Sequence, residues 1–223
     1  SFQPLALNYR QSDVQGEFKF DARAEKPLLV LNLQSPNLQI GQLLKDFVNL
    51  DVIEGKGTFD ASITGSGHSI AEIVGSLDGD ARLLMSEGRM RNEGLGFVSG
   101  LFSGIGEVLN NKQWVAIECL ASDFDIAQGI ATSKVGVLKT EVIELGVSGD
   151  INLATERYNL KIKPSPRGFD LSLAVPIDVR GPLSDPSFRP NTLATLTKLG
   201  TLLGSVLFPP AALIGLTELK TAH

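Results

Sequence analysis

Apolar and polar residues alternate along a stretch that runs from Phe169 to Arg180. Apolar residues occupy every second position of this stretch, namely Phe169, Leu171, Leu173, Val175, Ile177 and Val179. Because the side chains of a β-strand point alternately to its two faces, this pattern predicts a long strand with one continuous apolar face. Such a face either covers a closed core or lines an open groove.

Similar alternation, or a composition rich in β-forming residues, recurs along most of the chain. It predicts a strand with Phe59, Ala61 and Ile63 on one face, and further strands at residues 3–10, 14–24, 27–35, 77–87, 113–127, 130–139, 142–149 and 151–163. In the strand at 113–127 the apolar phase shifts between Ala121 and Phe124, as it does at a β-bulge, which would bend the sheet. The chain is therefore expected to be mainly β, with an opening meander.

Short helices are expected between some of these strands. Apolar residues at helical spacing, or cap signals, predict helices near residues 40–48, 69–75, 94–109 and 192–219. Ser69 and Glu72 have the spacing of a capping box, which marks the start of the second helix. The succession of strand, helix and strand around this helix also suits a parallel crossover.

The carboxyl end has a different composition from the rest. Residues 199–217 contain no charged side chain, but two prolines and three glycines interrupt the apolar run. We therefore expect a terminal helical hairpin over residues 191–223, beside one sheet domain over residues 1–190, rather than a membrane span. The candidate contacts of this hairpin with a membrane or a partner are Leu203, Val206, Leu207, Phe208, Leu213, Ile214 and Leu216.

The composition of the chain argues against several classes of function. The 20 Lys and Arg residues are scattered and are outnumbered by 25 Asp and Glu residues, so the basic patch of a nucleic-acid binder is missing. Cys119 is the single cysteine and is expected to be a small buried hydrophobe. The chain opens on a polar strand-like segment rather than a leader or an anchor, so it is expected to be either cytosolic or a fragment.

Residues for catalysis are scarce. With His68 and His223 as the two histidines, no nucleophile triad and no His-rich metal site can be assembled. The aspartate pairs at 78 and 80 and at 123 and 125 lack a full calcium loop, and we expect them at turns and strand edges. The sequence thus predicts a protein that is not an enzyme and has neither cofactor nor metal.

Three sequence elements occur in a consistent order. They are Ser-Leu-x-Gly-x-Ala at 76–81, Gly-x-Ile-x-Leu-x-Thr-Glu at 149–156 and Gly-x-Leu-x-Asp-Pro-Ser-Phe at 181–188. On these elements the region from about residue 38 to residue 191 resembles the carboxyl-terminal region of the AsmA family. The resemblance implies a curved, largely antiparallel sheet that forms an apolar groove, in the periplasmic part of a Gram-negative envelope protein whose inner-membrane anchor lies elsewhere.

The same resemblance implies a function in phospholipid transfer between the inner and outer membranes, and in outer-membrane assembly. The terminal helices would then contact the outer-membrane surface or an envelope protein. An alternative is a periplasmic scaffold without bound lipid. The candidate lining of a lipid groove is Phe59, Ala61, Ile63, Leu83, Met85, Val115, Ile117, Phe169, Leu171, Leu173, Val175 and Ile177.

Overall fold

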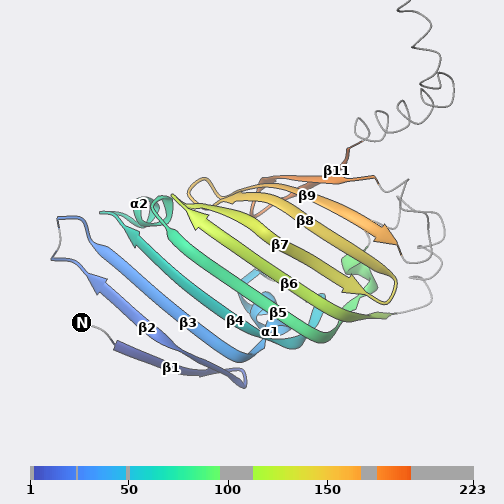
Figure 1. Ribbon diagram of the computed structural model, residues 1–223, viewed down its shortest axis with the longest axis horizontal. Coiled ribbons are helices and arrows are strands. Elements are labelled where there is room, and N and C mark those ends of the chain that lie inside the picture. Colours follow the sequence, from blue (N-terminus) through green and yellow to red (C-terminus); the bar gives the residue numbers. More distant parts are fainter. Residues whose placement is uncertain (1–2, 24, 49–50, 96–112, 167–174, 192–223) are drawn as a thin grey trace, which may run out of the picture.

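The computed structural model describes residues 3–23, 25–48, 51–95, 113–166 and 175–191. These residues form one antiparallel sheet in which each strand bonds to its neighbours in the sequence (Figure 1). The strands are β1 (Gln3–Tyr9), β2 (Ser12–Asp21), β3 (Leu28–Gln39), β4 (Ile53–Ser66), β5 (Asp78–Arg91), β6 (Trp114–Ala127), β7 (Ile130–Thr140), β8 (Ile143–Asn152), β9 (Arg157–Pro166), β10 (Ile177–Pro182) and β11 (Ser187–Pro190). The expected mainly β, antiparallel and curved fold is confirmed.

Two-residue turns make the tightest hairpins of this meander. Arg10 and Gln11 join β1 to β2 with φ of 51° and 66°, and Gln128 and Gly129 join β6 to β7 with φ of 50° and 70°. Positive φ at both central residues gives a turn whose twist matches that of the flanking strands. These turns keep adjacent strands in register, so apolar positions of neighbouring strands share a face.

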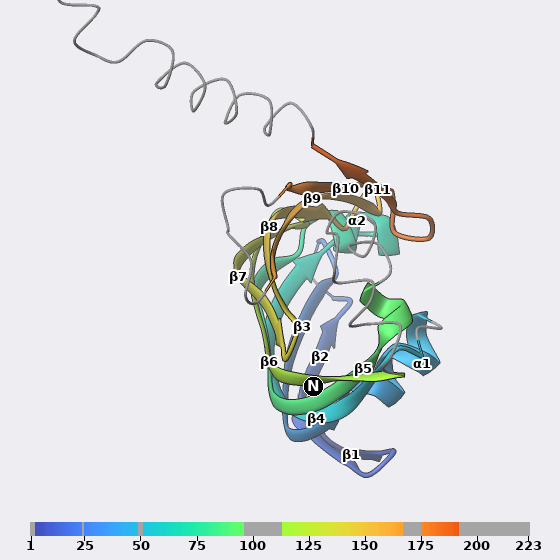
Figure 2. The same cartoon turned by 90° about the vertical axis from the view of Figure 1, so that its right-hand side faces the viewer.

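The sheet is strongly curved, and its helices lie on the open side of the curve (Figure 2). Irregularities in pairing accompany the curvature, with register shifts between Ile117 and Cys119 and between Asp123 and Phe124. The second shift falls where the apolar phase predicted a bulge in β6, but its extra residue, Lys134, lies on β7, and the phase of β6 itself changes earlier, between Ile117 and Leu120. After the first shift Leu120 lies on the concave face opposite Met85, because an extra residue reverses the alternation.

Three short helical elements are described: α1 (Ile40–Val48), α2 (Ile70–Gly75) and the 3₁₀ turn η1 (Asn92–Leu95). The helices predicted near 40–48 and 69–75 are thereby confirmed. Ser69 caps α2 as predicted, because the Glu72 amide donates to Ser69 Oγ at 3.2 Å; the Glu72 carboxylate reaches back to accept from the His68 amide at 2.8 Å, one residue before the cap. The helices expected near 94–109 and 192–219 lie outside the described residues, apart from the two residues within η1.

The parallel crossover considered for this region is wrong. Strands β4 and β5 are antiparallel neighbours, with Phe59 opposite Leu83 and Ala61 opposite Ala81. A parallel connection would have to return the chain along the whole of β4, which is about 46 Å for 14 residues. The six residues of α2 rise by only about 9 Å, which suits a connection at one end of the sheet.

Within the described residues, the strand predicted over 169–180 is represented by β10, which begins at Ile177. Val175 and Pro176 precede the strand, and Phe169, Leu171 and Leu173 lie outside the described residues. Pro176 has no amide hydrogen to contribute to the ladder, and its carbonyl oxygen accepts from the Asn191 amide at 2.7 Å, just past the end of β11.

The closed core lies on the concave face, at the strand ends next to α1 and η1. Its fully buried side chains come from α1, η1 and four strands that meet there: Ile40, Leu95, Met85, Val115, Ile143 and Ile177. The helical elements cover the sheet at this edge and exclude water from it. The rest of the concave face is less completely covered, and the candidate site lies there.

Candidate functional site

An apolar cavity of about 330 Å³ opens on the concave face between α1 and the middle of the sheet. Leu43 and Leu44 of α1 form one wall, and Phe59 of β4 and Leu83 of β5 contribute to the other. The remaining lining residues are Leu38, Ile40, Leu120, Ala121, Ser122, Phe124, Ser133, Gly136, Val137, Leu138 and Val147. Among the residues that the structure describes, none that lines this cavity is charged.

Helix α1 is held over the cavity by close backbone packing and by polar contacts. Gly41 lies so near β4 that a Cβ atom there would come within 2.1 Å of the Ile53 carbonyl oxygen. Tyr9 donates its hydroxyl hydrogen to Asp46, whose carboxylate is also 3.3 Å from Arg10. The bond to Asp46 raises the pKa of Tyr9, because the hydrogen bond and the nearby negative charge both favour the neutral phenol.

The apolar face extends beyond the closed core into solvent. Phe18 and Phe20 of β2 lie opposite Leu31 and Leu29, on the same face as the cavity, and are 43% and 45% exposed. At the other side of the sheet, Phe188 of β11 is on this face and is 46% exposed. Large apolar side chains left open to water across a curved face are typical of a binding surface.

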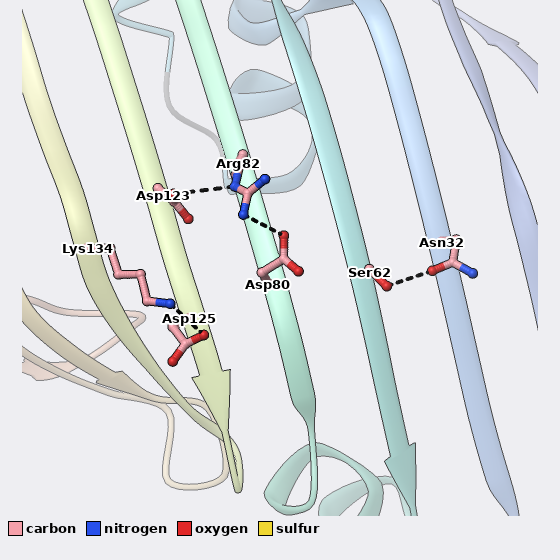
Figure 3. A network of polar contacts seen from close by, with 7 residues as sticks. All are labelled: Asn32, Ser62, Asp80, Arg82, Asp123, Asp125 and Lys134. Carbon is pink, nitrogen blue, oxygen red and sulfur yellow. Dashed lines mark hydrogen bonds and ion pairs between the residues drawn. The ribbon is translucent and has the colours of Figure 1, made fainter.

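The convex face is polar by contrast. Asn32 accepts from Ser62 at 2.8 Å, Arg82 lies 3.3 Å from Asp123 and 3.6 Å from Asp80, and Lys134 lies 2.9 Å from Asp125 (Figure 3). In the strand register these residues alternate with Phe59, Leu83 and Phe124. One surface of the sheet is therefore adapted to water and the other to apolar groups.

The structure divides the predicted groove residues into several groups. Phe59 and Leu83 line the cavity, and Ile63 is half-buried on the same face. Met85, Val115, Ile117 and Ile177 belong to the closed core, Ala61 is buried, and Val175 is half-buried ahead of β10. Phe169, Leu171 and Leu173 lie outside the described residues, as do the candidate contacts Leu203, Val206, Leu207, Phe208, Leu213, Ile214 and Leu216.

Sequence reasoning missed several cavity residues. Leu43 and Leu44 were part of the predicted helix, and their apolar spacing indicated that this helix must lie on another apolar surface. Leu120 and Leu138 pair directly across β6 and β7. Leu120 lies on the concave face because the register shift between Ile117 and Cys119 precedes it. The alternation of apolar residues ahead of that shift does not predict this position.

Cys119 is half-buried rather than buried, which corrects the expectation. The register shift between Ile117 and Cys119 takes its side chain off the face that carries Val115 and Ile117. Across the described ranges, no group of three or more His, Cys, Asp or Glu side chains is placed to hold a metal ion. In the same part of the chain, no helix has the length and apolar character needed to cross a bilayer.

Comparison with known proteins identifies the family. The model of the AsmA family matches residues 1–135, which is more than half of the chain. The chain belongs to the AsmA family. AsmA family protein YhjG of Escherichia coli (strain K12) is 28% identical to this AsmA-family chain over 220 residues.

The alignment with YhjG covers 96% of this chain and 32% of the relative, so the chain spans about a third of the length of the curated relative that it matches. No solved structure matches the chain. The family prediction from residues 38–191 is thus confirmed, and the family match also includes the first strands, which the three sequence elements did not cover.

Proposed function

We propose that this AsmA-family chain shelters phospholipid acyl chains on its concave face and acts in lipid transfer, without catalysis. The observation that carries the proposal is the apolar cavity between α1 and the sheet, in which no described lining residue is charged and which lies on the same face as the exposed side chains of Phe18, Phe20 and Phe188. An acyl chain requires an apolar surface and no particular hydrogen-bonding partner, which agrees with the residue types found there.

The size of the cavity suits part of one acyl chain. A methylene group occupies about the volume of a water molecule, roughly 30 Å³, so 330 Å³ is room for about ten methylenes. At about 0.8 kcal/mol for each methylene removed from water, the gross gain is about 8 kcal/mol. The loss of chain freedom on binding opposes this gain, so the net affinity is much smaller. Reversible binding of this kind suits transfer better than permanent storage.

Family membership supports the cellular setting that we propose. In this proposal the chain is a periplasmic segment of a longer protein that is anchored in the inner membrane of a Gram-negative cell. The segment contributes one stretch of a groove through which phospholipids pass toward the outer membrane and support its assembly. The chain spans about a third of YhjG, so the anchor and the inner-membrane end of the path would belong to the rest of the longer protein.

Adjacent leucines on opposite faces provide a sharp test. Leu83 lines the concave cavity, whereas Leu84 is 50% exposed on the convex face. We expect the purified chain to yield co-extracted phospholipid by mass spectrometry, Leu83→Asp to lose it, and Leu84→Asp to keep it. Leu83→Trp, which fills the cavity without adding charge, should also lose lipid while circular dichroism reports an intact fold.

Two results would refute the proposal. One is a folded chain that carries no phospholipid and does not bind a polyene fatty acid, which would favour the scaffold alternative. The other is equal lipid content in the Leu83 and Leu84 variants, which would place the lipid elsewhere on the surface.

A further inference from the structure

Two serine hydroxyls interrupt the otherwise apolar lining of the cavity, as far as its described residues are concerned. Ser122 lies on β6 and Ser133 lies on β7. In the strand register Ser122 is opposite Leu83 and Ser133 is opposite Phe124, so both side chains are on the concave face. The acyl-chain proposal gives this serine pair, Ser122 and Ser133, no role.

Both hydroxyls adjoin a space above Gly136 of β7. Ser122 is directly opposite Gly136, and Ser133 Oγ lies 3.0 Å from the position that a Cβ atom of residue 136 would occupy. Such a Cβ atom would also lie 2.6 Å from the Val147 carbonyl oxygen, so a larger residue does not fit there. Opposed side chains of an antiparallel pair start about 5 Å apart. The serine pair therefore makes one polar spot in the wall of the cavity.

The hydroxyl hydrogens of the serine pair are available to a ligand. Ser122 Oγ has no hydrogen-bond partner among the described residues, and Ser133 Oγ donates to the Val147 carbonyl at 3.4 Å. That distance is longer than the roughly 2.5–3.0 Å usual between a hydroxyl and its acceptor oxygen. A hydrocarbon that filled the cavity would displace water from both hydroxyls without replacing its hydrogen bonds, which costs free energy. The cavity therefore favours an occupant with an acceptor oxygen beside β6 and β7.

The ester groups of a phospholipid supply such an oxygen. They join the tails to glycerol, so their carbonyl oxygens are the acceptors next to the hydrocarbon. A serine hydroxyl donates readily to a carbonyl, and a few polar groups in a mainly apolar pocket fix the orientation of the ligand. A phosphate would instead favour cationic partners, and none of the described lining residues is charged.

The width of the sheet beneath the cavity agrees with a tail that starts at the serine pair. Strands β4 to β7 are consecutive neighbours (Figure 1), so β7 lies three strand spacings, or about 14 Å, from β4. Helix α1 packs beside β4, and its Leu43 and Leu44 form the cavity wall there. This span is close to the extended length of the roughly ten methylenes for which the cavity has room.

We propose that the serine pair binds the ester carbonyl of a phospholipid, and that the acyl tail runs from there across β5 and β4 to end under α1. This inference rests on the proposed function and adds an orientation and a linkage preference to it. Lipids with ester-linked tails then bind more tightly than lipids with ether-linked tails and the same headgroup, because an ether linkage has no carbonyl oxygen.

The experiment is a competition between two lipids that differ only in this linkage. The folded chain is incubated with vesicles that contain equal amounts of dioleoyl phosphatidylcholine and its dioleyl ether analogue, and it is then separated from the vesicles by gel filtration. Mass spectrometry measures the ratio of the two lipids bound to the chain. We expect about a fivefold excess of the ester lipid, which is the effect of one hydrogen bond to a neutral acceptor.

Variants of the serine pair assign the preference to its hydroxyls. Ser122→Ala should bring the ratio of ester to ether lipid close to one, whereas Ser122→Thr keeps a hydroxyl and should retain the excess. Ser133→Ala should lower the ratio by a smaller factor, because the Ser133 hydroxyl also bonds to the chain itself. Ser148→Ala is the matched control and should behave like the parent chain, because Ser148 is exposed on β8 opposite Lys161, on the convex face.

The outcomes separate this inference from the proposed function. Equal uptake of the two lipids by the parent chain would overturn the serine site and leave acyl binding intact. A Ser122→Ala variant with an intact fold by circular dichroism and the same ratio as the parent chain would overturn it as well. A parent chain that takes up neither lipid would instead refute the proposed function itself.

Discussion

Shortening a side chain in the closed core and shortening one at the cavity wall should have clearly different effects on the free energy of unfolding and on fatty-acid binding. Ile143 is 0% exposed at the start of β8, within the closed core. Leu83 is partly buried and already faces the empty cavity. Removing a buried side chain costs the lost transfer free energy plus a term for the new void, and a side chain beside existing space loses fewer contacts.

For Ile143→Ala we expect the free energy of unfolding to fall by about 3 kcal/mol, and for Leu83→Ala by about 1 kcal/mol. In a domain of this size each kcal/mol lowers the melting temperature by about 2–4 °C, so the first variant should melt about 6–12 °C lower. Urea unfolding followed by circular dichroism measures both changes. Displacement of a polyene fatty acid measures binding, which should weaken in Leu83→Ala and persist in Ile143→Ala below its melting temperature.

Unfolding and fatty-acid binding together test whether the concave face has a closed core beside an open groove. If both variants lost the same stability and both kept fatty-acid binding, the cavity would be an ordinary packing defect of the core. The distinction between a closed core and an open groove on one face of the sheet would then be wrong.

Three further predictions concern local structure. Replacing the Ser69 cap by alanine should lower the free energy of unfolding by about 1 kcal/mol in urea titrations, because α2 then loses a bond to one of its first amides. Thr140→Val should cost about 1–3 kcal/mol by the same assay, because the buried hydroxyl both donates to the Ile143 carbonyl and accepts from its amide. The pKa of Tyr9 is raised above its ordinary value of 10.0 in the folded chain, so the stability it contributes is present below that pH and is lost as the pH rises through the raised pKa. Tyr9→Phe should therefore flatten the fall in stability above pH 10, and an unchanged fall would show that the bond to Asp46 does not contribute.

Much of the sheet could be predicted from alternation. The spacing at Ile40–Val48 corresponds to α1, whereas the phase change of β6 lies between Ile117 and Leu120 rather than between Ala121 and Phe124 as predicted. Alternation reports which residues share a face within one strand, but it does not report how strands pair. The antiparallel pairing of β4 and β5 therefore had to come from the structure.

The candidate site was harder to predict from the sequence than the sheet, for a related reason. Met85 and Leu83 have the same phase on β5, yet Met85 is buried in the core and Leu83 borders the cavity. Their difference depends on where α1 and η1 cover the sheet, which is a tertiary property. Apolar periodicity therefore predicted a face but not which part of it stays open.

The sequence elements that indicated the family have a structural explanation. Each lies where the chain reverses direction, between α2 and β5, between β8 and β9, or between β10 and β11. Ser76 Oγ donates to the Ser66 carbonyl at 2.6 Å, and Ser187 Oγ donates to the Arg180 carbonyl at 2.8 Å. These hydroxyls fix turns, so the elements identify the family through turn geometry rather than through ligand contacts.

The meander has a consequence for how such proteins vary in length. Within the described sheet each strand bonds to strands adjacent in sequence, so a nascent chain can add strands as they emerge, without waiting for a distant partner. When one hairpin is inserted, the strands that follow it keep their direction and their side chains stay on the original faces. A single extra strand would instead reverse the direction of all the strands that follow. Homologues of different span should therefore differ by even numbers of strands.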